Sequence, residues 1–266
     1  MGDWITGWPM SGEAVRSDTV PPLPVLLCLP PAGAGCHQFR AWQRRLVGAA
    51  RVLGVQLPGR EERWSEAMPG SLEEAADAVA DALVPALAAG GDGRSAPLVV
   101  FGHSMGGLLG YEIARRSAPY ALVVSACPEP GRWRRPRGGA VADADIDHLL
   151  DTAEIDPGLL DAETRAHLAG MLRKDAELTA GYRHAPAPRL ALPVHVWAAE
   201  SDGTVHPDAL DGWRTVTDGP FHRHRIPGGH NAVLRRPEPL LAHLTSLLAD
   251  ASESGEDRTA APDTGA

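Results

Sequence analysis

Short apolar runs alternate with amphipathic stretches along most of this chain, and the alternation predicts a layered arrangement of strands and helices. Five runs are apolar almost throughout, at residues 25–29, 51–57, 98–102, 121–125 and 194–199. An uninterrupted apolar run is typical of a strand buried on both faces of a sheet. A sixth run, at 222–226, is more polar and predicts a strand nearer the sheet edge. The pattern therefore predicts an α/β fold, with a mostly parallel central sheet and helices on both faces.

Helical patterns fill the stretches between these runs. The sequence Ser-Leu-Glu-Glu at 71–74 forms a capping box, which predicts a helix that continues to about Leu87. Pro85 lies inside this pattern and is expected to kink or shorten the helix. Residues 105–116 predict a second helix directly after a strand, and leucines at positions 240, 241, 244, 247 and 248 share one face of a last helix. Between two core strands, the acid-rich helical pattern at 143–179 predicts a lid insertion over about 143–180.

The length of 266 residues suits one domain with an insertion. We expect disorder in residues 1–20 and in the acidic tail 250–266, which lacks bulky apolar residues. The folded domain is then expected over residues 21–249. The first twenty residues contain no apolar stretch, so they are not expected to act as a secretory signal.

Charge and cysteine content restrict the range of functions. The net charge of −9 argues against nucleic-acid binding, because phosphates require a basic surface. No apolar run approaches the length of about 18 residues that crosses a bilayer, so no membrane partner is expected. Cys28, Cys36 and Cys127 are odd in number and scattered, which fits neither a disulfide framework nor a metal site. We therefore expect a cytoplasmic protein with no metal site.

The strongest chemical signal is the sequence Gly102-His103-Ser104-Met105-Gly106, between a predicted strand and a predicted helix. This is G-x-S-x-G in the context of a nucleophile elbow, a sharp turn that exposes a serine hydroxyl. The turn is crowded, so close neighbours must lack Cβ atoms, and Gly102 and Gly106 meet that need. The amides that begin the following helix can stabilise negative charge. Ser104 is the predicted nucleophile, and an inert serine in a glycine-rich turn is the alternative.

A serine nucleophile needs a base, and in this architecture the acid and the histidine follow the serine along the chain. His230 comes after two glycines and the last predicted strand, so it is the predicted base. The histidines at 222, 224 and 243 are expected to be solvated or core residues. Two acids follow the strand at 194–199, and we favour Asp202 over Glu200 because it lies deeper in the turn and precedes Gly203. The alternative for Asp202 is a turn or N-cap aspartate.

An oxyanion hole requires two backbone N–H groups near the nucleophile. Met105, the residue after Ser104, is expected to supply one of them. The small, glycine-rich loop 30–35 after the first core strand is expected to supply the other. Prolines have no N–H, so Pro30 and Pro31 are excluded and Ala32 is the predicted donor.

Several segments, in consistent order, resemble one family: the type II (editing) thioesterases of polyketide and nonribosomal peptide synthases, within the α/β-hydrolase superfamily. The resemblance covers roughly residues 22–248. It is carried by the sequences CLPPAGA at 28–34, VQLPGR at 55–60, FGHSMG at 101–106, KDAEL at 174–178 with Tyr182, and GGH at 228–230. Two positions depart from the family. Pro31 stands where the family has a histidine, and Asn231 stands where an aromatic residue often follows the catalytic histidine.

The resemblance implies an α/β-hydrolase fold and a serine thioesterase that removes acyl groups from the phosphopantetheine arm of carrier proteins, under a helical lid. It places the triad on Ser104, Asp202 and His230 and the oxyanion donors on Ala32 and Met105. No cofactor is expected in the enzyme, whose partners are acyl or peptidyl carrier proteins and small acyl thioesters. The elbow and triad also leave open a carboxylesterase, a lipase or a product-releasing thioesterase, and a non-catalytic binding protein of the same fold.

An arginine-rich stretch precedes the predicted lid. From Arg132 to Arg137 it places four arginines around Trp133. Loops in this position lie on the active-site side of such a sheet, and the carrier proteins of these synthases are generally acidic. Two interpretations stay open: a docking surface for the carrier, or a solvated loop that aids solubility or pairs with acids of the lid.

Overall fold

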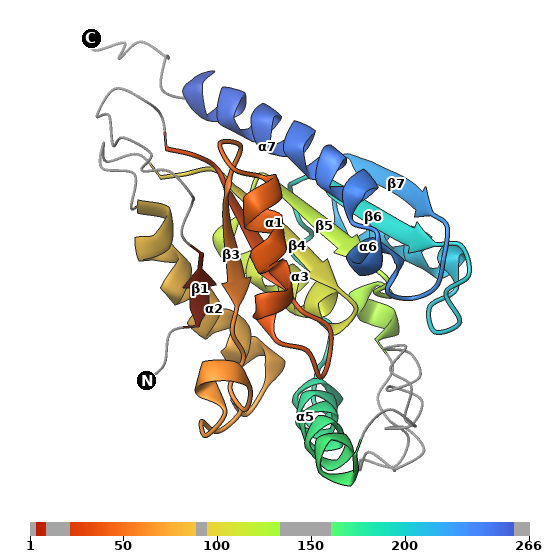
Figure 1. Cartoon of the computed structure of the whole chain (residues 1–266). Coiled ribbons are helices and arrows are strands. Elements are labelled where there is room, and N and C mark those ends of the chain that lie inside the picture. The colour runs from red at the N-terminus through yellow and green to blue at the C-terminus, as the bar shows by residue number, and fades with distance from the viewer. Residues whose placement is uncertain (1–3, 9–21, 89–94, 134–160, 258–266) are drawn as a thin grey trace.

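The computed structural model of this chain describes residues 4–8, 22–88, 95–133 and 161–257. In this part of the chain, a seven-stranded sheet has the order β1-β3-β2-β4-β5-β6-β7 (Figure 1). The strands are β1 (Ile5–Gly7), β2 (Val25–Leu29), β3 (Arg51–Val55), β4 (Leu98–His103), β5 (Ala121–Ser125), β6 (Val194–Ala199) and β7 (Phe221–Ile226). Neighbouring strands are parallel except β1, which pairs with β3 in the antiparallel sense. The predicted α/β fold with a mostly parallel sheet is confirmed, with the polar strand β7 at its edge.

Helices cover both faces of the sheet. They are α1 (Arg40–Arg45), α2 (Leu72–Ala88), α3 (Met105–Ser117), α5 (Ala162–Ala180), α6 (Ala232–Arg235) and α7 (Glu238–Asp257). Short 3₁₀ segments lie at Cys36–Phe39, Glu61–Arg63, Pro130–Arg132 and Pro207–Val216. Helices α2 and α3 lie on one face and α1 and α7 on the other, while α5 lies beyond the carboxyl ends of the strands (Figure 1). Ligands of open α/β sheets bind at that end, so α5 stands where a lid is expected.

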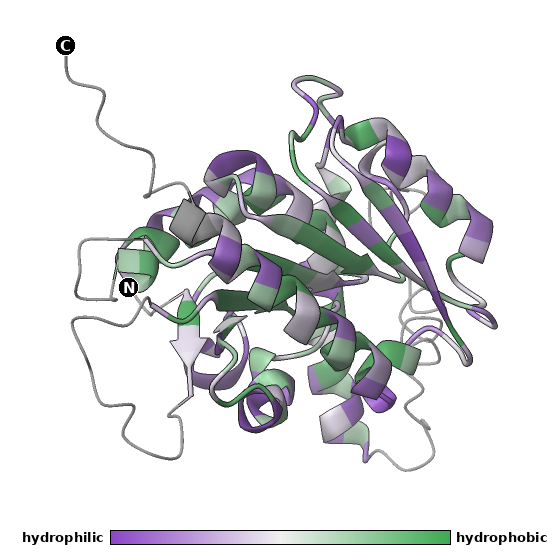
Figure 2. Ribbon diagram, turned by 90° about the horizontal axis from the view of Figure 1, so that it is seen from above, coloured by the Kyte–Doolittle hydropathy of each residue, from purple (hydrophilic) through white to green (hydrophobic). Residues whose placement is uncertain are grey.

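Two apolar cores, one on each face, hold the helices to the sheet. Successive residues of a strand point to opposite faces. Leu27 and Val100 therefore belong to the core beside α2 and α3, and Leu26 and Phe101 belong to the core beside α1 and α7. All four side chains are fully buried, and Figure 2 shows the middle strands as hydrophobic. Each such side chain contributes about 1.5–3 kcal/mol of burial free energy, so the strand ends are held in fixed positions.

Both ends of the chain are ordered further than expected, so the predicted disorder of 1–20 and 250–266 is wrong in part. Residues Ile5–Gly7 form β1, which pairs with β3, and the side chains of Trp4 and Ile5 pack against the core. At the other end α7 continues to Asp257, because Leu248 and Ala251 still face the core. The rest of these two segments lies outside the described residues.

Helix α2 begins as predicted and ends at Ala88, within one residue of the predicted end near Leu87. The hydroxyl of Ser71 accepts a hydrogen bond from the N–H of Glu74 at 3.1 Å, which caps the helix. The expected shortening at Pro85 is wrong, because α2 continues through it to Ala88. Pro85 is exposed and lies in the last turns, so the carbonyl that it leaves without a helical partner can bond to water.

The predicted lid is helical where the structure describes it, over α5, whereas its first part lies in residues 134–160, outside the described residues. The thiols of Cys28, Cys36 and Cys127 are all buried and free. Among the described residues, no helix is at once long and apolar enough to span a bilayer. The cytoplasmic location stays a prediction.

Candidate active site

Ser104 lies in the turn that joins β4 to α3, at the carboxyl end of the sheet. Its backbone has φ 53° and ψ −122°, a conformation that side-chain-bearing residues rarely adopt and that costs roughly 1–3 kcal/mol. The N–H of Ser104 donates to the carbonyl of Ser125 on β5 at 2.8 Å, which holds the turn. The side chain is half-buried. The turn therefore presents the hydroxyl at the carboxyl end of the sheet rather than in the core.

The predicted need for glycine on both sides of Ser104 is confirmed. A Cβ atom on Gly102 would lie 2.1 Å from the carbonyl oxygen of Gly106. A Cβ atom on Gly106 would lie 2.4 Å from the carbonyl oxygen of Leu29. Both clashes are with backbone atoms, which cannot rotate away. A larger residue at either position would push α3 away from β4 or from the loop that follows β2.

His230 and Asp202 are in direct contact. Nδ1 of His230 lies 2.9 Å from Oδ2 and 3.1 Å from Oδ1 of Asp202. Asp202 follows β6 and His230 follows β7, so the parallel pairing of these two strands brings their loops together. The histidine is 7% exposed and the acid 9% exposed, whereas Glu200 is on the surface. The structure thus brings the predicted acid, and not its alternative, to the histidine.

The surroundings of Asp202 favour its charged form. Burial alone would raise its pKa, but the hydrogen bond and charge of His230, together with two backbone amides, outweigh burial and lower the pKa. The amides of Thr204 and Val205 donate to Oδ1 at 2.8 Å and 3.0 Å. The Asp202 carboxylate therefore accepts hydrogen bonds from the amides of its own turn, as expected for a turn aspartate, and it also contacts His230. A charged acid at Nδ1 keeps a proton there, which leaves Nε2 of His230 able to accept one.

A second histidine, His103, lies against His230 and was not predicted as part of the site. The two ring centroids are 5.2 Å apart. Nε2 of His103 donates to Oδ1 of Asn231 at 3.0 Å. Burial, and then the charge of His230, lower the pKa of His103 to about 3, so this ring is neutral near pH 7. Asn231, a departure from the family pattern, is thus the residue that orients His103. The sequence signal was a histidine at the end of a fully apolar strand.

The loop after β2 leaves the predicted donor, the backbone amide of Ala32, available. The N–H of Gly33 donates to Oδ2 of Asp175 at 2.7 Å, and the N–H of Ala34 donates within the loop at 3.2 Å. The amide of Ala32 has no acceptor among the described residues. Met105 is the first residue of α3, so its N–H lies at the positive end of a helix. Both predicted oxyanion donors therefore lie in segments that flank the serine turn.

A buried ion pair connects this loop to helix α5, in the predicted lid. The guanidinium of Arg60 contacts both carboxylate oxygens of Asp175, with 2.8 Å between Nη1 and Oδ2. Nη1 of Arg60 also donates to the carbonyl of Ala34 at 3.0 Å. The two charged side chains are 2% and 0% exposed. Because Asp175 also accepts the N–H of Gly33, one carboxylate joins α5, the segment after β3 and the loop that carries Ala32.

This ion pair was not predicted, although both partners lie in segments that carry the resemblance. The two residues are 115 positions apart, so no local spacing connects them. One signal was present. Asp175 lies three residues from Leu172 and three from Leu178, and both leucines are buried. An acid on the apolar face of a helix needs a buried cationic partner, and arginine is the side chain best suited to a buried ion pair.

The carboxyl end of α5 is attached to the body at a second point. The hydroxyl of Tyr182 donates to Oε1 of Glu112 on α3 at 2.9 Å. Arg116 contacts the other oxygen of Glu112 at 2.7 Å. Helix α3 begins directly after Ser104, so α5 and the residues that follow it are anchored to the helix of the serine turn as well as to the loop that carries Ala32.

Ser104 lies at the same end of the sheet as the acid–histidine pair and forms no hydrogen bond with it among the described residues. Among the described residues, none forms a hydrogen bond with the Ser104 hydroxyl. Ser104 is next in sequence to His103, whose ring lies against His230, so serine and histidine share one end of the sheet. Catalytic hydrogen bonds are often long in structures that hold no substrate. The roles of Ser104, His230 and Asp202, and of the two amides, stay predictions.

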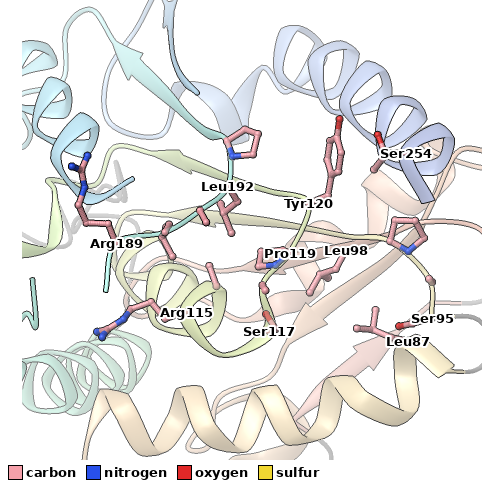
Figure 3. A pocket seen from close by; sticks show the side chains of 18 of the residues that line it. Leu87, Ser95, Leu98, Arg115, Ser117, Pro119, Tyr120, Arg189, Leu192 and Ser254 are labelled. Atoms are coloured by element: carbon pink, nitrogen blue, oxygen red, sulfur yellow. The ribbon is translucent and has the colours of Figure 1, made fainter. Parts of the chain in front are cut away.

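A cavity of about 690 Å³ lies at the opposite end of the sheet (Figure 3). Leu98, Tyr120 and Leu192, which line it, lie at or just before the amino ends of β4, β5 and β6. The charged and hydroxyl-bearing groups in its described lining are arginines, serines and Tyr120, and this lining holds no acid or histidine. A hydroxyl there has no base, so we place the candidate site at the serine turn.

The arginine-rich stretch is described only at its start. Nε of Arg132 lies 3.0 Å from Oε1 of Glu129, and Trp133 follows. Residues 134–137 lie outside the described residues, so both interpretations of this stretch stay predictions.

Comparison with known proteins points to one family. A family model described as "Thioesterase domain" matches residues 24–248. The chain is 33% identical over 243 residues to the AMB antimetabolite synthetase AmbE of Pseudomonas aeruginosa. That match covers 88% of this chain and 11% of AmbE, so the chain spans only a small part of that relative's length.

Two solved structures share the fold over nearly the whole chain. One is the type II thioesterase BorB from the borrelidin biosynthetic cluster, with a TM-score of 0.77, 28% identity, and coverage of 93% of this chain and 98% of BorB. The other is RedJ, a thioesterase from the prodiginine biosynthetic pathway in Streptomyces coelicolor, with a TM-score of 0.74, 32% identity, and coverage of 90% and 96%. These likenesses confirm the α/β-hydrolase fold that the sequence resemblance implied.

Proposed function

The chain belongs to the thioesterase family, and we propose that it hydrolyses acyl thioesters on the phosphopantetheine arm of carrier proteins in polyketide or nonribosomal peptide biosynthesis. Its role there is editing, the removal of acyl groups that block a carrier. The likeness to BorB, a type II thioesterase, and to RedJ, a thioesterase of the prodiginine pathway, supports this role. The match to AmbE covers too little of that protein to transfer its overall activity.

One observation carries the proposal: a buried acid–histidine pair stands at the same sheet end as a serine held in a strained turn. The 2.9 Å contact between Asp202 and Nδ1 of His230 orients the ring. A serine hydroxyl is a weak nucleophile until such a base is within reach. Ser104 is accordingly the nucleophile, His230 the base and Asp202 the group that sets the tautomer of the ring.

The reaction proceeds in two acyl transfers. Nε2 of His230 takes the proton of Ser104 while the serine oxygen attacks the thioester carbonyl, and the amides of Ala32 and Met105 hold the oxyanion. The C–S bond then breaks, and the pantetheine thiol leaves with the proton from His230. Next, His230 takes a proton from water, whose oxygen attacks the acyl-serine ester. The C–O bond breaks, Ser104 regains a proton, and the acid is released while Asp202 holds Nδ1–H throughout.

Arg60 and Asp175 act as positioning residues in this scheme. Asp175 accepts the amide of Gly33 at 2.7 Å, and Arg60 holds the carbonyl of Ala34 at 3.0 Å. The loop is therefore fixed on the carboxyl side of Ala32, whose amide is left for the substrate. An oxyanion donor is effective only when its direction is set before the reaction.

The test compares an acyl-N-acetylcysteamine thioester with the oxyester of the same acyl group, using the purified chain. We expect the thioester to be hydrolysed with the higher kcat/KM, and Ser104→Ala to lose about 10⁴-fold of that rate. A general carboxylesterase would cleave both substrates equally well. A binding protein of this fold would cleave neither, and a fluorophosphonate would not label its Ser104.

Docking of the carrier is tested separately through the arginine-rich stretch. Changing Arg134 and Arg135 together to Glu should raise KM for an acyl-carrier substrate and leave the small thioester almost unaffected. The carrier reaction should also weaken as salt rises, because surface charges are screened over about 8–10 Å. An equal loss on both substrates would mean that the arginines support the fold, and no loss on either would favour the solvated loop.

A further inference from the structure

Three histidines far from the serine turn direct ring nitrogens toward one another. His195 lies on β6, His224 on β7 and His243 on α7. Nδ1 of His195 is 3.5 Å from Nε2 of His224 and 3.1 Å from Nε2 of His243. One nitrogen from each ring lies within 4.8 Å of the nitrogens of the other two. Three separate elements therefore contribute to a single cluster, which we call the three-histidine cluster.

Strand register and aromatic packing explain how these rings are held. In the parallel pairing of β6 and β7, His195 is opposite His222, and Trp197 is opposite His224. Alternate residues of a strand share a face, so all four side chains point toward α7, which carries His243. His222 stacks on His195 at 4.4 Å, and Trp197 stacks on His224 at 4.8 Å between ring centroids. Rings fixed by such packing offer their nitrogens in set directions.

We propose that His195, His224 and His243 bind a divalent transition-metal ion of the zinc class. Two imidazole nitrogens at about 2.0–2.1 Å from one tetrahedral Zn²⁺ lie about 3.3–3.4 Å apart. The two separations that involve Nδ1 of His195, 3.1 Å and 3.5 Å, lie on either side of that value. Imidazole ligands suit Zn²⁺, Ni²⁺ and Cu²⁺. His224 and His243 are half-buried, so water can reach a fourth coordination position.

A hydrogen-bonded trio accounts for the same contacts less well. A nitrogen of neutral imidazole either carries one hydrogen or offers one lone pair. Nδ1 of His195 faces a nitrogen of His224 and a nitrogen of His243 at once. It can form a good hydrogen bond with only one of them. A metal ion, by contrast, accepts a lone pair from all three nitrogens.

The charge state of the cluster also suits a metal, because neutral imidazole is the form that binds one. Burial, and then the neighbouring histidines, lower the pKa of His195 to about 3 and the pKa of His224 to about 4. Burial and then His222 lower the pKa of His243, while Asp250 acts in the opposite direction. The rings of His195, His224 and His243 are thus neutral near pH 7, and the nearby carboxylate of Asp250 favours a bound cation.

A metal here would join β6, β7 and α7. The loop that carries His230 runs between β7 and α7, so the ion would hold the elements on both sides of that loop. From the sequence we expect no metal site, and we expect His224 and His243 to be solvated or core residues. His224 and His243 lie 29 and 48 positions from His195, and no ligand-spacing motif connects residues so far apart.

The experiment uses the whole chain without a polyhistidine tag, freed of metal with a chelator and then titrated with Zn²⁺ against a chromophoric chelator. We expect one Zn²⁺ per chain. We also expect the melting temperature to rise by about 5–10 °C when free Zn²⁺ is a hundredfold above Kd, since the folded state alone binds it. Co²⁺ in the same site should show the intense visible absorption of tetrahedral coordination.

Substitutions assign the binding to the cluster. His195→Gln and His243→Gln should each abolish Zn²⁺ binding and the thermal shift. The control is His222→Gln, which removes a stacked ring without removing a converging nitrogen and should retain both. If a buried variant fails to melt cooperatively in chelator, His224→Gln on the edge strand takes its place. Absence of Zn²⁺ binding by the unchanged chain, or binding that persists in folded His224→Gln and His243→Gln, would overturn the proposal and leave the hydrogen-bonded trio.

Discussion

Asp202 and Asp175 are both buried carboxylates that join distant segments, yet their different partners allow only one of them to take part in proton transfer. Asp202 faces His230, whose charge changes whenever its ring gains or loses a proton. Asp175 faces Arg60, whose guanidinium stays charged at any accessible pH. The first pair can follow a proton transfer, and the second can only fix positions. Burial of an acid therefore does not identify a catalytic group, and the nature of its partner does.

The two pairs are also held by different elements of the fold. Asp202 and His230 lie in loops at the ends of adjacent strands, which the sheet holds in place. Asp175 belongs to α5, whose contact with the oxyanion loop runs through Arg60 and Gly33. We therefore expect loss of Asp202 to reduce turnover in an intact fold. Loss of Asp175 should reduce stability more than turnover.

The largest expected effect comes from removing the partner of Asp202. His230→Ala should lower thioester hydrolysis by about 10⁴-fold or more, because the serine then lacks its base. The measurement is kcat/KM on a small acyl thioester, with circular dichroism to establish that the fold is retained. The matched control is His206→Ala, at an exposed histidine whose hydrogen bond and ion pair are with Asp208 and not with Asp202, which should leave the rate unchanged. Near-normal turnover by folded His230→Ala would contradict the assignment.

Asp202→Asn should follow, with a loss of about 10³–10⁴-fold in kcat. An amide at this position no longer holds the tautomer in which Nε2 accepts the serine proton. Glu200→Gln, an exposed acid two residues away, is the control and should stay active. The reverse pattern, an active Asp202→Asn and an inactive Glu200→Gln, would show that the acid is misassigned.

Asp175→Asn tests the other pair. Leaving the Arg60 charge buried and unpaired should cost roughly 3–5 kcal/mol of unfolding free energy, with a smaller loss of turnover, about 10- to 100-fold. Chemical denaturation measures the first quantity and kcat the second. Glu177→Gln, an exposed acid on the same helix, should change neither.

A double variant separates stability from positioning. Arg60→Met with Asp175→Leu replaces the ion pair by apolar packing and should recover much of the stability. It should not recover kcat, because nothing then holds the amide of Gly33. Full recovery of both would show that the pair has no positioning role.

The lid should affect selectivity more weakly. Leu168 is half-buried on α5, so Leu168→Phe should change the ratio of rates on long and short acyl thioesters by a few-fold through access to the site. Leu172 is a less suitable position for this selectivity test. Its side chain is buried against Gly33, so a larger side chain there would strain the loop that carries Ala32. Ala166→Phe, on the exposed face, is the control. Equal ratios in all variants would place α5 away from the acyl group.

The smallest effect concerns acid stability. The folded-state pKa of Asp202 lies below its ordinary value of 3.8. The charged carboxylate therefore stabilises the folded state at pH values above 3.8, and this stabilisation is lost as the pH falls through the lower folded-state pKa. The melting temperature of the unchanged chain should therefore approach that of Asp202→Asn as pH falls below about 4. A gap that stays constant down to the lowest pH at which both fold would contradict the charged state of Asp202.

Local patterns sufficed to predict much of this fold. Each core strand was apparent as an apolar run, and the elbow around Ser104 was apparent because its glycines must be close in sequence. His230 and Asp202 could be placed because each follows a recognisable strand. Their contact then depends only on the pairing of β6 and β7.

Other features depend on long-range pairing that no local pattern shows. Residues Ile5–Gly7 become β1 only because the edge of β3 is available to them. The partners Arg60 and Asp175 meet across 115 residues, and the bond between His103 and Asn231 spans 128. Such contacts follow from the three-dimensional fold, so the sequence could indicate at most that a charged residue or a histidine lay in an apolar setting.

The most direct test of the account follows Ser104 during turnover. The purified chain is mixed with an acyl thioester and quenched within the first turnovers, and the mass of its peptides is measured. We expect one acyl group on the peptide that contains Ser104, which disappears as free acid forms, and neither adduct nor hydrolysis in Ser104→Ala. Hydrolysis by Ser104→Ala at the unchanged rate, or an acyl group on another residue, would contradict it.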